Sequence, residues 1–156
     1  MALTLAVLTA CAGFLLAVLW MDLIFDAQVL SPRHAGDELP ESVLASIAGY
    51  YHRATARPMS TLIAAVMGVL LTALAVRAKF GHDPGWLVAV SAALAGGAVV
   101  LALIRTVPHA VRLGQRADSL AQQTRLARAI FRDHVLCFGM MLAFLGLWLA
   151  AVSLGL

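Results

Sequence analysis

Long apolar stretches without any charged residue alternate with shorter polar segments along this chain. Each of these stretches is about 20 residues long, which lets an α-helix cross the roughly 30 Å hydrocarbon core of a bilayer. The four stretches are Met1–Met21, Pro58–Val76, Gly85–Ile104 and Val135–Leu156. The pattern predicts an all-α fold, a polytopic integral membrane four-helix bundle. The predicted spans cover about 1–25, 58–77, 85–105 and 134–156.

The polar segments between the spans carry helical patterns of their own. Pro40 is typical of a first helical position, and apolar side chains recur at helical spacing from there until Pro58 breaks the helix. Pro108 is expected to kink or end the third span, with an amphipathic helical extension beyond it. Ser31–Asp37 has the composition of an exposed turn. We therefore expect one domain over 1–156, with amphipathic cytoplasmic extensions within about 26–57 and 106–133.

Basic residues are distributed unevenly over the three segments between the spans. Nine of the eleven lysines and arginines fall in the first and third segments, which must lie on the same side of the membrane; only Arg77 and Lys79 fall in the second. The positive-inside rule places the basic side in the cytoplasm. The sequence thus predicts a multi-pass protein of the cell inner membrane with both termini on the non-cytoplasmic side. Because topology explains the net charge of +3, no nucleic-acid partner is expected.

Composition limits the classes of function. The chain is 62% hydrophobic and 12% charged, whereas a soluble domain carries about 25% charged residues. No ionisable residue lies centrally in a predicted span, although channels, pumps and ion-coupled transporters commonly need such groups or broken helices. This absence disfavours transport, and a small oligomeric channel remains only a further alternative.

Acidic and histidine side chains collect where the helices enter the cytoplasmic side. Asp22 and Asp26 are four residues apart and so share one helix face, while His134 opens the fourth span. The adjacent Asp133 does not point at His134 on a helix, so an aspartate of the first helix is the better candidate to orient the imidazole and raise its basicity. The candidate catalytic residues are therefore His134, Asp22 and Asp26.

The same end carries side chains suited to an anionic or amphipathic ligand. All six basic residues of the third segment are arginines, and a guanidinium makes forked contacts to phosphate or carboxylate that an ammonium does not. We expect a lipid-like ligand, with its apolar body among the helices and its polar or anionic head on the basic side chains. The candidate ligand-binding residues are Tyr51, His52, Arg57, Arg105, His109, Arg112 and Arg132.

Two other interpretations of this polar end remain open. Neutral imidazoles with an aspartate suit zinc, iron, copper or haem, so His52, His109 and His134 are candidate metal ligands, although they lack the i, i+4 spacing of a strong motif. Alternatively, the aspartates only tie helix ends together through ion pairs. Their candidate partners are Arg53, Arg57, Arg105 and Arg132. The protein would then be a non-catalytic subunit or assembly factor, in a homo-oligomer or with a membrane protein partner, with membrane lipid around it.

The segment Arg105–Arg112 and the triplet Arg132-Asp133-His134 also carry a resemblance. Together with the order of the four spans, they resemble small uncharacterised bacterial four-span membrane proteins and, faintly, the anthrone-oxygenase-like group. The resemblance covers about the final third of the chain. It implies oxidation of an apolar aromatic substrate at the membrane, with His134 as the first residue to test.

Overall fold

A computed structural model describes residues 2–30 and 38–155 and confirms the all-α fold. The described elements are α1 (Ala2–Asp26), η1 (Ala27–Leu30), α2 (Glu41–Ala54), α3 (Met59–Phe80), α4 (Gly85–Leu101), η3 (Ala102–Thr106), α5 (Val107–Gln115) and α6 (Leu120–Leu154). Within this part of the chain, four helical stretches are long and apolar enough to cross a membrane, as expected for a multi-pass protein. The turn predicted at Ser31–Asp37 lies outside the described residues.

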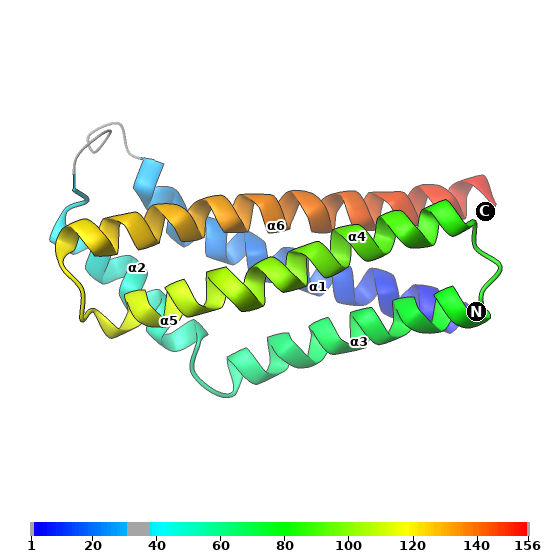
Figure 1. Cartoon of the computed structure of the whole chain (residues 1–156), viewed down its shortest axis with the longest axis horizontal. Coiled ribbons are helices and arrows are strands. Elements are labelled where there is room, and N and C mark those ends of the chain that lie inside the picture. Colours follow the sequence, from blue (N-terminus) through cyan, green and yellow to red (C-terminus); the bar gives the residue numbers. More distant parts are fainter. Residues whose placement is uncertain (1, 31–37, 156) are drawn as a thin grey trace.

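The four long helices run lengthwise beside one another (Figure 1). Helix α1 packs against α6 and α3, and α4 packs against the same two helices from the other side. The start of α1 and the end of α6 lie together at one end of the bundle (Figure 1). The opposite end is formed by α2, α5 and the first turns of α6, and we call it the α2–α5 end.

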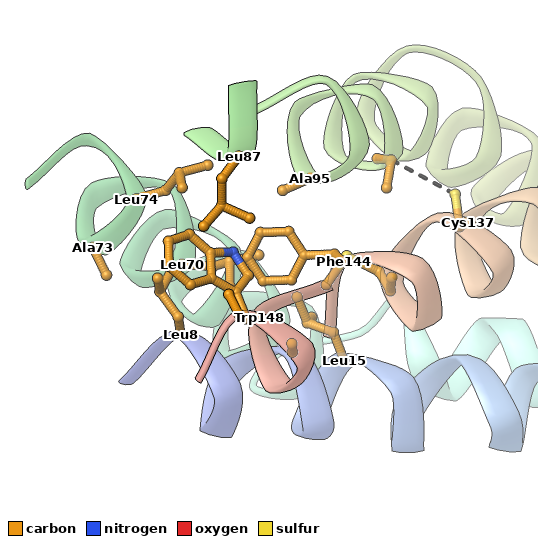
Figure 2. Close-up of a cluster of buried hydrophobic side chains, with 14 residues drawn as sticks. Leu8, Leu15, Leu70, Ala73, Leu74, Leu87, Ala95, Cys137, Phe144 and Trp148 are labelled. Carbon is orange, nitrogen blue, oxygen red and sulfur yellow. Dashed lines mark hydrogen bonds between the residues drawn. The ribbon is translucent and has the colours of Figure 1, made fainter. Parts of the chain in front are cut away.

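A hydrophobic core fills the half of the bundle that is remote from α2 and α5 (Figure 2). Trp148 and Phe144 of α6 are its largest members and are almost fully buried among leucines of α1, α3 and α4. The guanidinium of Arg77 lies 4.9 Å from the centre of the Trp148 ring and also pairs with Asp83. The cation therefore covers the indole while its charge is neutralised by a carboxylate.

A second, smaller core joins α2, α5 and the beginning of α6. The apolar face of α2 contributes Leu44 and Ile47, which pack with Leu113 and Ile130. Pro40 stands at the N-cap position of α2, one residue before the predicted first helical position, and α2 ends at Ala54, so a break before Pro58 is confirmed. This core holds α2 across the end of the bundle (Figure 1).

The extension predicted beyond Pro108 is two helices rather than one. Arg116 adopts a left-handed backbone conformation with φ 53°, which ends α5. The hydroxyl of Ser119 then accepts a hydrogen bond from the backbone N–H of Gln122 and caps α6. A serine followed three residues later by glutamine is a capping signal. Consequently α6 is 35 residues long and starts well before the predicted span at 134.

The third span does not end at Pro108. The helix continues through the π-helical turn η3 into α5, so the helical stretch runs from Gly85 to Gln115. Proline lacks an N–H and its ring crowds the preceding turn. The wider π turn just before Pro108 accommodates that crowding. The helix is therefore irregular at this turn but does not end there.

Gly114 marks a close approach between α5 and α2, and its replacement has a predictable effect. A Cβ atom at this position would lie 3.1 Å from the backbone nitrogen of His52 and 3.3 Å from its Cα. We expect Gly114→Ala to lower the free energy of unfolding by about 1–3 kcal/mol, because backbone atoms cannot move aside as a side chain can.

Gly139→Ala is the matched control, since nothing lies within 4 Å of its Cβ position in α6. The control should be neutral or stabilising by up to about 1 kcal/mol through helix propensity. Apparent melting temperatures in mild detergent, from the folded peak on size-exclusion chromatography, compare the two variants. Equal melting temperatures would contradict the close approach of α2 and α5.

Candidate functional site

Two aspartates of α1 and one histidine of α6 form a buried polar cluster near the α2–α5 end. Asp22 is 8% exposed, Asp26 0% and His134 7%. The i, i+4 spacing in α1 directs both carboxylates to one side of the helix, as the sequence predicts. The pairing of α1 with α6 then brings that side against His134.

Asp26 holds the imidazole of His134 from one side. Its Oδ2 lies 2.7 Å from Nδ1 of His134, and its Oδ1 accepts a 2.6 Å hydrogen bond from the hydroxyl of Tyr51. The same hydroxyl is 3.3 Å from Nδ1. Both oxygens of Asp26 are thus occupied, so neither the carboxylate nor the imidazole can rotate without breaking a buried contact.

Asp22 faces the other ring nitrogen of His134. Its Oδ1 accepts a 2.7 Å hydrogen bond from the hydroxyl of Tyr50, whose ring stacks on Phe25 at 4.1 Å between centroids. Its Oδ2 lies 3.7 Å from Nε2 of His134, which is too long for a hydrogen bond. This nitrogen therefore keeps its hydrogen-bonding capacity for another partner.

The two tyrosines of α2 act as neutral hydrogen-bond donors. Burial, followed by the charge of the neighbouring carboxylates, raises the pKa of Tyr50 and of Tyr51 above the ordinary value. Both phenols therefore keep their protons at neutral pH. Each stabilises one aspartate of α1, and sequence reasoning assigned this role to neither tyrosine.

The cluster borders a cavity of about 380 Å³ between α1, α3, the α4–α5 helix and α6. Asp22, Tyr51 and His134 contribute to its polar wall. The rest of the wall is mostly apolar and includes Leu15, Ile63, Met67, Ala102, Val107 and Met141. An apolar cavity of this size with a few converging polar groups is typical of a small-molecule site.

Asp133 is turned away from this cluster although it precedes His134 in the chain. Its Oδ2 lies 3.1 Å from Nε of Arg105, in an ion pair that lacks the alignment of a hydrogen bond. This arrangement agrees with the expectation that Asp133 and His134 form no dyad. It also gives Arg105 a carboxylate of α6 as its partner, so the expected ion pair between Arg105 and an aspartate of α1 is not found.

The arginines proposed to bind an anionic head group are not gathered around the cavity. Arg112 makes hydrogen bonds of 2.7 and 2.8 Å to Asp118 at the surface, and Arg57 and Arg132 are exposed. None of the residues lining the cavity is an arginine or lysine, as far as the chain is described. The structure therefore does not assemble the predicted anionic pocket.

The three histidines proposed as metal ligands are not brought together either. His52 is exposed on α2 and His109 is half-buried on α5, with its Nδ1 lacking a hydrogen-bond partner, while His134 lies in the cluster with Asp26. In residues 2–30 and 38–155, no group of three or more His, Cys, Asp or Glu side chains is arranged to hold a metal ion. Of the predicted site residues, the structure joins Asp22, Asp26, Tyr51 and His134.

Comparisons with known proteins identify no family for this chain. No family model matches the chain, and neither a curated protein nor a solved structure matches it.

Proposed function

We propose that this protein binds an amphipathic or lipid-like molecule in the cavity beside His134 and acts on it by proton transfer. The observation that supports this most directly is the orientation of the imidazole. Nδ1 is fixed by the buried carboxylate of Asp26 at 2.7 Å, while Nε2 faces Asp22, and both His134 and Asp22 line the cavity. A histidine held through one nitrogen by a carboxylate presents the other nitrogen as a general base.

The neighbouring groups have distinct roles in this proposal. Asp26 is a positioning residue, because it stabilises the imidazolium that forms when His134 takes a proton. Asp22 is the second group near the reacting atoms. It lies 3.7 Å from Nε2 of His134, so a polar group of the ligand can approach both side chains and exchange a proton with either. Tyr51 keeps Asp26 in place and borders the cavity itself.

The location of the site follows from the charge distribution. With nine of eleven basic residues in the segments containing α2, α5 and the start of α6, we place the α2–α5 end in the cytoplasm. Both termini then lie on the outer side of the inner membrane. The ligand would reach the cavity from the cytoplasmic half of the bilayer.

Native mass spectrometry of the protein, purified in a nonionic detergent, tests the proposal. The wild type should carry a bound small molecule, and Ala102→Phe should lose it because the added ring fills the cavity. Val100→Phe is the control, since Val100 is 54% exposed and lies outside the cavity. The molecule extracted from His134→Ala should differ in chemical structure from the one extracted from the wild type, as seen by NMR, because the substrate is no longer converted; a proton transfer alone can leave the mass unchanged.

Two results would count against the proposal. If Ala102→Phe still carries the bound molecule, the cavity is not the binding site. An identical bound molecule at the same occupancy in His134→Ala would contradict the proton transfer while leaving binding intact.

The second candidate is a non-catalytic subunit or assembly factor. Ion pairs that connect separate helices at the α2–α5 end favour it, namely Arg105–Asp133 between η3 and α6 and Arg116–Glu41 between α5 and α2. A partner chain that copurifies at fixed stoichiometry would support this candidate. A chain that purifies alone with a bound small molecule would oppose it.

A further inference from the structure

We infer that the molecule taken by the cavity is a lipophilic cation, with an apolar body and an ammonium head. This inference rests on the proposed binding function and narrows its ligand class. It departs from the anionic head group that the arginine-rich sequence suggests. The charged groups around the cavity favour a cationic head group.

Carboxylates outnumber cations around His134, although only Asp22 of the two aspartates lines the cavity. Asp22 and Asp26 face one imidazole, so even a fully protonated His134 leaves one negative charge on the ionised cluster. Arg105, the nearest basic residue along the helix that contains η3, has its charge matched by Asp133. An unmatched charge is costly in a low-dielectric environment, and a cationic ligand would neutralise it.

Arg53 is a cation that lines a hollow together with Asp22. This second hollow lies on the Tyr50 side of Asp22, and Arg53 does not line the cavity itself. Its side chain is exposed, so solvent and lipid head groups screen its charge. Arg53 therefore leaves the cavity side of the cluster without a matching positive group.

The remaining walls suit the other parts of such a molecule. The phenol ring of Tyr51 lines the cavity next to the carboxylates, and aromatic faces attract ammonium groups. Leu15, Ile63 and Met141 offer apolar surface for an alkyl or aryl body. A carboxylate or phosphate head would instead approach Asp22 against like charge.

Three probes with one alkyl chain and different head groups test this assignment. Dodecyltrimethylammonium, dodecanol and dodecanoate are titrated into the purified protein, the two ionic probes below their micellar concentrations and dodecanol below its solubility limit. One-to-one complexes are counted by native mass spectrometry. The ammonium probe should bind about tenfold more tightly than either other probe, as expected for a desolvated opposite charge. Tight binding of dodecanoate or dodecanol would overturn the inference.

Two variants identify the carboxylate responsible. Asp22→Asn should weaken binding of the ammonium probe about tenfold while leaving dodecanol unaffected. Glu41→Gln makes the same change of charge at an exposed residue that pairs with Arg116, and it should bind like the wild type. Melting temperatures show that both variants are folded. Unchanged binding in folded Asp22→Asn would contradict the assignment.

The outcomes separate this inference from the function on which it rests. If dodecanol or dodecanoate binds best and Ala102→Phe abolishes that binding, the cavity is a ligand site of another class. If no probe distinguishes the wild type from Ala102→Phe, and no molecule copurifies, the inference and the proposed function both fail.

Discussion

Asp26→Ala is expected to lower the free energy of unfolding by about 3–5 kcal/mol, the range for removing one partner of a buried charged pair. The carboxylate is fully buried and accepts the hydrogen bond of Tyr51 while it contacts Nδ1 of His134. Alanine would leave the Tyr51 hydroxyl and Nδ1 of His134 with only each other, at 3.3 Å, in place of the buried carboxylate. Equilibrium unfolding in mixed micelles, followed by tryptophan fluorescence, measures the change.

Two comparisons make this expectation specific to the buried cluster. Tyr51→Phe removes the hydrogen bond to Asp26 and the 3.3 Å contact with Nδ1 of His134 but keeps both charged groups, and it should cost about 1–2 kcal/mol. Glu41→Ala removes an exposed carboxylate paired with Arg116 and should change stability little. If Asp26→Ala were no more harmful than Glu41→Ala, the cluster would contribute nothing to the folded state.

Trp148→Ala should destabilise the opposite half of the bundle by a similar amount, about 3–5 kcal/mol. Trp148 is 1% exposed and packs beside Phe144 and Leu87 (Figure 2). In lipid the main loss is van der Waals contact around the new cavity, because helices in membranes are held by packing rather than by escape from water. The cation of Arg77 would also lose the ring that it covers.

Trp86→Ala is the matched control, since Trp86 is 55% exposed at the start of α4. Its removal deletes the same number of atoms without opening an internal cavity. The ratio of folded to unfolded protein in mixed micelles, measured by resistance to proteolysis, compares the two variants. Equal destabilisation by both substitutions would show that the core around Trp148 is not tightly packed.

The helices were predictable because lipid imposes a simple rule on the sequence. A spanning helix must satisfy its backbone internally and present apolar side chains on all sides, so uncharged runs identify it directly. The finer features follow from local signals that hydropathy does not report. Ser119 and Gln122 start α6 early through capping, and the π turn before Pro108 compensates for the missing N–H.

The site was only partly predictable, because residue spacing shows which side chains share a helix face but not which side chains of other helices they contact. The four-residue interval between Asp22 and Asp26 correctly indicates a shared face, and His134 at the start of a span correctly indicates proximity to it. The arginines illustrate this limit, since their number suggests an anion site and does not show that Asp118, Glu41 and Asp133 pair with three of them. Such pairings depend on packing angles that no interval in the sequence encodes.

The length of α6 has a mechanical consequence. At about 1.5 Å per residue the helix extends roughly 50 Å, so its first turns project well past a hydrocarbon layer of about 30 Å. The hydroxyl of Thr124 accepts a hydrogen bond from the backbone of Leu39, and His134 lies about three turns further along the same helix. Because Thr124 and His134 belong to one continuous helix, the hydrogen bond to Leu39 also anchors the helix that carries the imidazole.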